Sequence, residues 1–142
     1  MRLLILNGPN LNMLGQREPE IYGGQTLEDI LQELRDAFPQ HQIEHLQSNY
    51  EGALCERIQE AMHDGTEGLI INAGALTHYS YVLHDALAML KLPKVEVHLS
   101  HLFAREPFRH TSVISPVCHG MISGLGPQGY HLAIAYLTQN AK

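Results

Sequence analysis

The sequence predicts an α/β fold in which a five-stranded parallel sheet carries helices on both faces. Short apolar runs typical of buried parallel strands alternate along the chain with segments whose apolar residues recur at helical spacing. The chain has 142 residues, which is enough for one compact core and too few for two ordinary domains. We therefore expect residues 1–142 to form a single domain.

Five segments have the composition of strands. Residues 1–6 and 68–72 are continuous apolar runs, as expected for strands buried on both faces. Residues 42–47 alternate between apolar and polar side chains, which suits a strand at the edge of the sheet. The other two predicted strands are residues 94–99 and 117–122.

Apolar residues at helical spacing predict four helices that alternate with these strands. Thr26 is a candidate N-cap for the first helix, which Pro39 ends, and Thr77 is a candidate N-cap for the third. The second helix covers residues 54–62, and the fourth follows the glycine-rich segment 124–129. With right-handed crossovers, these elements give a flavodoxin-like, doubly wound sheet.

The composition predicts a subunit interface and argues against several classes of partner. Charged residues make up 17% of the chain, against about 25% in typical soluble domains, so we expect additional buried surface. The net charge of −6 gives no general attraction for nucleic acid or an acidic membrane surface. No apolar run approaches the roughly 20 residues of a membrane span. Cys55 and Cys118 lack a disulfide-like spacing and suit structural thiols in a reducing cytoplasm.

Polar residues follow three of the predicted strands at the points where the strands end. Asn7 follows the first strand, Asn72 ends the third, and His98 lies near the end of the fourth. Parallel strands bring their carboxyl ends to one edge of the sheet, where open α/β sheets bind their ligands. Residues 7–23, rich in Gly, Pro and Asn, are a candidate working loop, and residues 15–24 are a candidate lid.

The chain strongly resembles type II 3-dehydroquinate dehydratase, a hydro-lyase of the shikimate pathway of aromatic amino acid biosynthesis. The resemblance implies removal of water from 3-dehydroquinate to give 3-dehydroshikimate, through an enolate and without a metal, a Schiff base or an organic cofactor. It also implies a cytoplasmic homo-oligomer in which trimers associate into a dodecamer. The matching segments are residues 7–23, 47–52, 72–80, 96–110 and 126–132.

The resemblance implies that Tyr22 is the base, which requires a tyrosinate although the ordinary pKa of tyrosine is near 10. One close cation typically lowers such a pKa by about one to three units, so Arg17 and Arg105 together are expected to suffice. Arg17 also stabilises the transition state by this resemblance, and Asn10 holds the enolate oxygen directly or through water.

His98 is the expected general acid, because imidazole titrates near physiological pH. Glu96 lies two positions earlier on the same strand face, from which its carboxylate can orient and charge the ring. The resemblance assigns substrate binding to Asn72, His78, Asp85, Leu99, Ser100 and Arg109.

The seven-residue step from His78 to Asp85 predicts that both lie on one helix face. By resemblance, Asp85 reaches the site of a neighbouring subunit. Three positions depart from the family pattern without touching the expected catalytic residues. Ala73 replaces a usual proline, Tyr79 a small polar residue and His101 a usual asparagine. We expect these departures to affect substrate affinity and interface packing, and not the reaction.

Two other functions have some support in the sequence. A flavodoxin-like module that binds a nucleotide or flavin phosphate would use a glycine-rich turn, and residues 124–129 have Gly-x-Gly-x-x-Gly spacing, but no βαβ unit follows them. A metal hydrolase is suggested by ten histidines, among which His98, His101 and His110 are grouped, but no HExxH or Cys/His spacing defines a metal site.

Overall fold

The computed structural model describes residues 1–16, 18–22 and 24–139, without the side chains of Pro19 and Tyr22. Its five strands are all parallel and follow the order β2-β1-β3-β4-β5, which confirms the flavodoxin-like sheet. β2 lies at one edge, as its alternating sequence predicts. The strands are β1 (Arg2–Asn7), β2 (Gln42–Gln47), β3 (Gly68–Asn72), β4 (Lys94–His98) and β5 (Gly120–Ser123).

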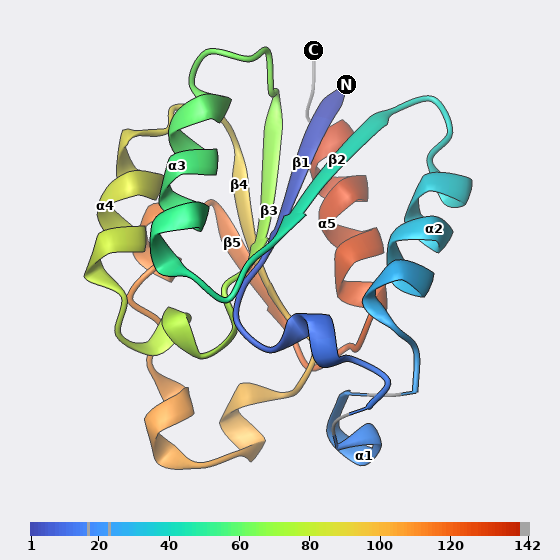
Figure 1. Cartoon of the computed structure of the whole chain (residues 1–142), viewed down its shortest axis with the longest axis vertical. Helices are drawn as coiled ribbons and strands as arrows, with labels where there is room; N and C mark the ends of the chain where they lie inside the picture. The colour runs from blue at the N-terminus through green and yellow to red at the C-terminus, as the bar shows by residue number, and fades with distance from the viewer. Residues whose placement is uncertain (17, 23, 140–142) are drawn as a thin grey trace.

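Helices cover both faces of the sheet (Figure 1). α2 (Leu27–Ala37) and α5 (Gln128–Gln139) pack on one face, and α3 (Glu51–Ala61) and α4 (Tyr81–Met89) pack on the other, so that each pair encloses its own apolar core. The short helix α1 (Pro19–Tyr22) lies in the loop that follows β1. The 3-10 helices are η1 (Leu11–Met13), η2 (Gly74–His78), η3 (Leu102–Ala104), η4 (Pro107–His110) and η5 (Ser115–Val117). In the described part of the chain, no helix is both long enough and apolar enough to cross a membrane.

The predicted cap of α2 is confirmed. The amide of Asp29 donates to the hydroxyl of Thr26 at 3.1 Å, and the amide of Thr26 donates to the carboxylate of Asp29 at 3.2 Å. This reciprocal pair satisfies two backbone donors that would otherwise lack partners at the helix N-terminus.

The predicted cap of α4 is wrong. Ser80, rather than Thr77, caps this helix, because its hydroxyl accepts from the amide of Leu83 at 3.1 Å. Thr77 belongs to η2, where its hydroxyl is fully buried and committed to another partner. The prediction that His78 and Asp85 share one helix face is therefore also wrong, since they lie in η2 and α4 respectively.

The last strand begins at Gly120 and not at residue 117. Pro116 lies in η5, where the amide of Val117 donates to the carbonyl of Ile114 at 3.1 Å and the amide of Cys118 donates to that of Ser115 at 3.0 Å. Because these amides bond within the turn, they do not pair with β4.

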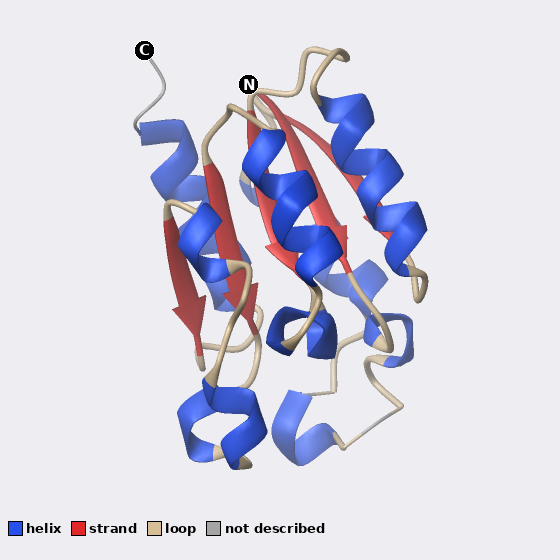
Figure 2. Ribbon diagram, turned by 90° about the vertical axis from the view of Figure 1, so that its left-hand side faces the viewer, coloured by secondary structure: helices blue, strands red, loops and turns tan. Residues whose placement is uncertain are grey.

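Two loops touch where β1 and β3 end, at the end of the molecule where the short helical turns gather (Figure 2). The amide of Gly8 donates to the carbonyl of Asn72 at 2.8 Å. A Cβ at Gly8 would overlap the carbonyl oxygen of Ala73 and lie 2.7 Å from its carbon, and a Cβ at Gly74 would lie 3.0 Å from the carbonyl oxygen of Pro9. Only glycine permits this approach, which brings the loops of β1 and β3 to the same place.

Gly8→Ala should lower the free energy of unfolding by about 1–3 kcal/mol, because the new methyl group must push two backbones apart. Urea unfolding followed by circular dichroism measures the effect. Gly52→Ala is the matched control, because a Cβ at Gly52 in α3 meets no atom within 4 Å. The control should keep the stability or raise it by up to about 1 kcal/mol. Equal stability of Gly8→Ala and the wild type would contradict the close contact.

Candidate active site

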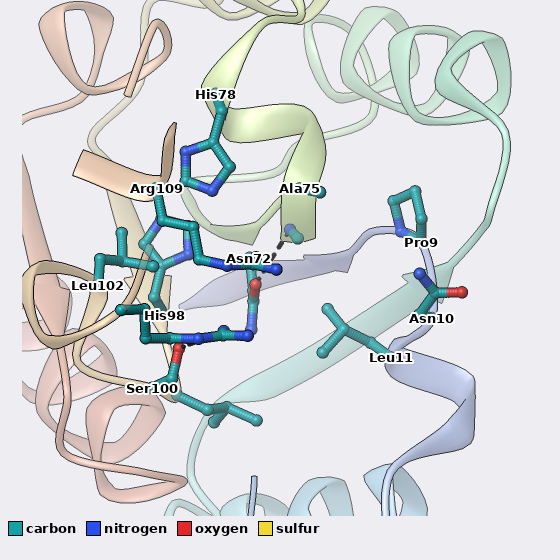
Figure 3. A pocket seen from close by; sticks show the side chains of 13 residues that line it. Pro9, Asn10, Leu11, Asn72, Ala75, His78, His98, Ser100, Leu102 and Arg109 are labelled. Atoms are coloured by element: carbon teal, nitrogen blue, oxygen red, sulfur yellow. Dashed lines mark hydrogen bonds between the residues drawn. The ribbon is translucent and has the colours of Figure 1, made fainter. Parts of the chain in front are cut away.

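A cavity opens at the carboxyl edge of the sheet, between the loops that follow β1, β3 and β4 (Figure 3). The cavity lies at the ends of the three central strands of the sheet, β1, β3 and β4, which are neighbours in that order. This is the edge at which open α/β sheets bind ligands. The predicted site residues that line the cavity are Asn10, Asn72, His78, His98, Leu99, Ser100, Arg105 and Arg109.

Two predicted site residues with described side chains, Glu96 and Asp85, do not line this cavity. Glu96 lies behind His98, with no exposure to solvent. Asp85 lies on α4, and 79% of its side chain is exposed. Arg17 lies outside the described residues, as does the side chain of Tyr22.

His98 and Glu96 form a buried pair. Nε2 of His98 contacts Oε2 of Glu96, and the side chains of the two residues are 5% and 0% exposed. The predicted pairing along one face of β4 is therefore confirmed. Because Nε2 is bonded to the carboxylate, Nδ1 is the ring nitrogen that remains for a ligand in the cavity.

The carboxylate of Glu96 is also held by two hydroxyl groups. Thr77 donates to Oε2 at 2.6 Å, and Ser112 lies 3.0 and 2.8 Å from the two oxygens. The amide of Ser115 donates to the Ser112 hydroxyl at 3.1 Å, which leaves the hydroxyl hydrogen for Glu96. Burial alone raises the pKa of Glu96, but hydrogen bonds from His98, Thr77 and Ser112 outweigh it, so the pKa lies below its ordinary value.

Thr77 and Ser112 are parts of this site that the sequence did not predict. Thr77 was assigned to a helix cap, and Ser112 lies in an irregular loop with no motif around it. The only available signal was the general requirement that a buried carboxylate have hydrogen-bond donors.

The loop of residues 111–113 holds His78 as well. Nδ1 of His78 donates to the carbonyl of Thr111 at 2.7 Å, and the amide of Val113 donates to the carbonyl of Thr77 at 2.7 Å. Burial is the largest cause that lowers the pKa of His78, which favours the neutral ring. A neutral ring with its hydrogen on Nδ1 presents Nε2 as an acceptor.

Two arginines supply positive charge to the cavity of an acidic chain. Arg105 donates from Nη1 to the hydroxyl of Ser100 at 3.0 Å. Arg109 donates from Nε to Glu106 at 3.0 Å, and its guanidinium lies 4.5 Å from the ring centroid of Phe108. These contacts hold both cations in place, so an anionic ligand meets charges that are already oriented.

Several features considered in the sequence have local structural explanations. Gly124, in the glycine-rich turn, has φ +91°, and a Cβ there would lie 2.9 Å from Cβ of His101. His110 bonds the carbonyl of Arg105 at 3.1 Å. In the described part of the chain, no group of three or more His, Cys, Asp or Glu could hold a metal ion. Burial raises the pKa of Cys118 to about 12, which suits a structural thiol.

Ser112→Ala should raise the pKa of Glu96 and lower the free energy of unfolding at neutral pH by about 1–2 kcal/mol, because one donor to a buried carboxylate is lost. The folded-state pKa of Glu96 is below its unfolded value, so its stabilising effect is present above the unfolded pKa and is lost as pH falls through the folded pKa. The deficit of the variant should therefore shrink in acid. Urea unfolding from neutral pH down to well below the ordinary glutamate pKa of 4.5 measures it, and Ser112→Thr, which keeps the hydroxyl, is the control. A deficit independent of pH would disprove this role.

Comparisons with known proteins agree with this geometry. The family model described as "Dehydroquinase class II" matches residues 1–138. A 3-dehydroquinate dehydratase from Deinococcus radiodurans is 57% identical over 139 residues, covering 96% of this chain and 97% of that protein. One from Bacillus subtilis is 55% identical over 136 residues, covering 94% of this chain and 91% of that protein.

The crystal structure of a type II dehydroquinase from Butyrivibrio crossotus is also similar. It superposes with a TM-score of 0.95 at 48% identity, over 97% of each chain. The structure of a type II dehydroquinase from Propionibacterium acnes gives a TM-score of 0.94 at 41% identity, over 98% of this chain and 97% of that one. The chain therefore belongs to the class II dehydroquinase family, and its activity is that of a type II 3-dehydroquinate dehydratase, a hydro-lyase.

Proposed function

We propose that the cavity removes water from 3-dehydroquinate through an enolate, with His98 as general acid and with neither a metal nor an organic cofactor. The observation that carries this proposal is the buried pair of His98 and Glu96, which leaves Nδ1 of the ring for the cavity. The reaction serves the shikimate pathway. We further propose that residues 1–142 form one catalytic domain.

The reaction is a proton abstraction followed by loss of a hydroxyl group. A base takes the proton from the carbon beside the ketone, and the electron pair of that C–H bond forms the enolate. The enolate then collapses to a carbon–carbon double bond conjugated with the ketone, and the C–O bond to the departing hydroxyl breaks. His98 gives its Nδ1 proton to that oxygen, so that water leaves.

Glu96 makes His98 suitable as an acid. Its pKa lies below the ordinary value, so the carboxylate is negative at neutral pH, and it contacts Nε2 and orients the ring of His98. The strand fixes both side chains, so the proton is held in one direction before substrate arrives.

Asn10 is our proposed donor to the enolate oxygen, directly or through water. The backbone of Asn10 is left-handed with φ 70°, a conformation that asparagine tolerates. Its backbone amide donates to Oδ1 of Asn49 at 2.9 Å. This fixes the residue at the rim of the cavity. From this position its side-chain amide can donate to the negative charge that develops on the enolate oxygen.

The remaining cavity residues bind the substrate. We propose that the substrate carboxylate accepts hydrogen bonds from the backbone amides of Leu99 and Ser100 and from the hydroxyl of Ser100, close to the charge of Arg105. We propose that His78, Arg109 and Asn72 bind the ring hydroxyls of the substrate. Nε2 of His78 then accepts a hydrogen bond from a hydroxyl.

Tyr22 is the proposed base, on the strength of the family resemblance, and residues 15–24 form the proposed lid. Glu20 and Ile21, its described neighbours in α1, line a second cavity together with Ser100 and Arg105. This proximity supports a role for Arg105 in lowering the pKa of Tyr22, alongside Arg17. Arg17 would also stabilise the transition state.

Variants of His98 and Tyr22 should separate the two proton transfers. His98→Ala should lower kcat by about 10²–10⁴-fold and still exchange the proton beside the ketone with deuterium from solvent, because the base is intact. Tyr22→Phe should lose both elimination and exchange. The ultraviolet absorbance of the conjugated product reports elimination, and proton NMR in D₂O reports exchange.

His63→Ala, which alters an exposed histidine at the end of α3, is the control and should match the wild type. The proposed acid is refuted by a His98→Ala rate within a few-fold of the wild type. The proposed base is refuted if Tyr22→Phe retains rapid exchange.

We propose a cytoplasmic homo-oligomer of trimers that build a dodecamer, in which Asp85 acts in a neighbouring site. Tyr79, Tyr81 and Val82, at and before the start of α4, are exposed large side chains on the part of the surface that also carries Asp85. The low charged fraction of 17% likewise supports an interface. Burial of these apolar groups would bring the exposed carboxylate of Asp85 to a second subunit.

Asp85→Ala should raise KM about tenfold with a smaller effect on kcat, because it removes a substrate contact and no reacting group. Mixed oligomers test the cross-subunit role. A site in an Asp85→Ala chain that receives Asp85 from a neighbouring His98→Ala chain has both groups. Co-expression should therefore produce sites that combine the wild-type kcat with the wild-type KM, a combination that neither variant has alone.

Asp36→Ala, on the exposed side of α2, is the matched control for Asp85→Ala. Mixed oligomers verified by native mass spectrometry that show only the raised KM of Asp85→Ala would refute the cross-subunit assignment. A monomer in light scattering would refute the assembly.

A further inference from the structure

A line of polar side chains runs from the edge of the sheet to the cavity. Asn7 and Asn72 lie in register at the ends of β1 and β3, and the hydroxyl of Tyr130, from the first turn of α5, lies between them. Nδ2 of Asn72 donates to this hydroxyl at 3.0 Å, and the hydroxyl donates to Oδ1 of Asn7. Nδ2 of Asn7 then donates to Nε2 of His45, on β2, at 3.0 Å. We call these four residues the amide relay.

The centre of the amide relay is sealed from solvent. Tyr130 is 1% exposed, Asn7 is fully buried and Asn72 is 3% exposed. Burial raises the pKa of Tyr130 well above its ordinary value, so the hydroxyl keeps its hydrogen. With so little contact with water, each polar group depends on its neighbour in the relay for a hydrogen-bond partner.

A backbone group sets the direction of the amide relay. The amide of Gly74 can only donate, and it donates to Oδ1 of Asn72 at 3.2 Å. Nδ2 of Asn72 must then face Tyr130, whose hydroxyl accepts and passes its own hydrogen to Asn7. Asn7 in turn can only present Nδ2 to His45.

The other end of the amide relay agrees with this direction. Burial, with a smaller effect of Arg35, lowers the pKa of His45 to about 4. The ring is therefore neutral at neutral pH and can accept at Nε2. A donor at one end and an acceptor at the other leave only one arrangement in which every member is satisfied.

We propose that Tyr130 is a positioning residue for the dehydration, because its hydroxyl fixes which atoms of the Asn72 amide face the substrate. This inference rests on the proposed function, in which Asn72 binds a ring hydroxyl. The two ends of an asparagine amide have nearly the same shape and opposite hydrogen-bonding character, so packing alone does not choose between them. The relay leaves the second hydrogen of Nδ2 and the remaining lone pair of Oδ1 for the ligand, in a fixed orientation.

A double-mutant cycle of Tyr130→Phe and Asn72→Ala tests the proposal. Tyr130→Phe should lower kcat/KM about 10- to 100-fold, mainly through KM, because the freed amide no longer presents one orientation. In the Asn72→Ala background the same substitution should change kcat/KM by less than about threefold, since the group it orients is already gone. Its effect on the unfolding midpoint should be present in both backgrounds.

Tyr136→Phe removes a hydroxyl from another tyrosine of α5 and should leave kcat/KM unchanged. Asn7→Leu is a second variant that keeps Tyr130 and removes its acceptor, which covers the case in which Tyr130→Phe does not fold. It too should lower kcat/KM only where Asn72 is present.

Equal loss of kcat/KM from Tyr130→Phe or Asn7→Leu in both backgrounds would mean that these residues act through packing, and would overturn the positioning role. Wild-type kcat/KM in Asn72→Ala would instead overturn the substrate-binding role of Asn72 on which the inference rests. The two failures are therefore distinguishable.

Discussion

A carboxylate without exposure to solvent lies behind His98, and much of the site follows from the need to keep that charge satisfied. Removing a carboxylate from water costs several kcal/mol unless good hydrogen bonds replace the lost solvation. Glu96 obtains them from His98, Thr77 and Ser112. This requirement draws residues 111–113 back against η2, and the same segment then fixes His78 through the carbonyl of Thr111. His98, the proposed acid, and His78, the proposed substrate-binding ring, are thus held by the same segment.

The capture of an anionic substrate by a chain of net charge −6 depends on local geometry. Arg105 is held by the hydroxyl of Ser100, and Arg109 is held by Glu106 and the face of Phe108. Charges restrained in this way lose little conformational freedom when a ligand binds, and they interact more strongly in a partly enclosed cavity than in water. The net charge of the chain therefore does not predict the charge of the ligand, whereas the restrained guanidinium groups of Arg105 and Arg109 favour an anionic one.

The sequence predicted side-chain positions correctly where the regular geometry of a strand or of the parallel sheet determined them. The period of two along β4 placed Glu96 beside His98, and the parallel order of the strands brought Asn72 and His98 to one cavity. Prediction failed where a partner lay far along the chain. Thr77 is the cap that the sequence predicts for α4, but the buried carboxylate 19 residues after it takes its hydroxyl, and Ser80 caps the helix instead. Ser112 has no local pattern, because its function is set by a contact across the fold.

The two faces of the sheet support the cavity in different ways, and the difference follows from the chemistry each must perform. On the face covered by α3 and α4, Thr77 in η2 and Ser112 in the loop after η4 supply two hydroxyl donors that hold the charge of Glu96 beside His98. On the face covered by α2 and α5, Tyr130 brings a single hydroxyl into an apolar core. One hydroxyl cannot compensate a buried charge, but it can complete a neutral line of amides. In the proposed mechanism, the residues that support proton transfer therefore lie on the first face, and those that orient the Asn72 amide lie on the second.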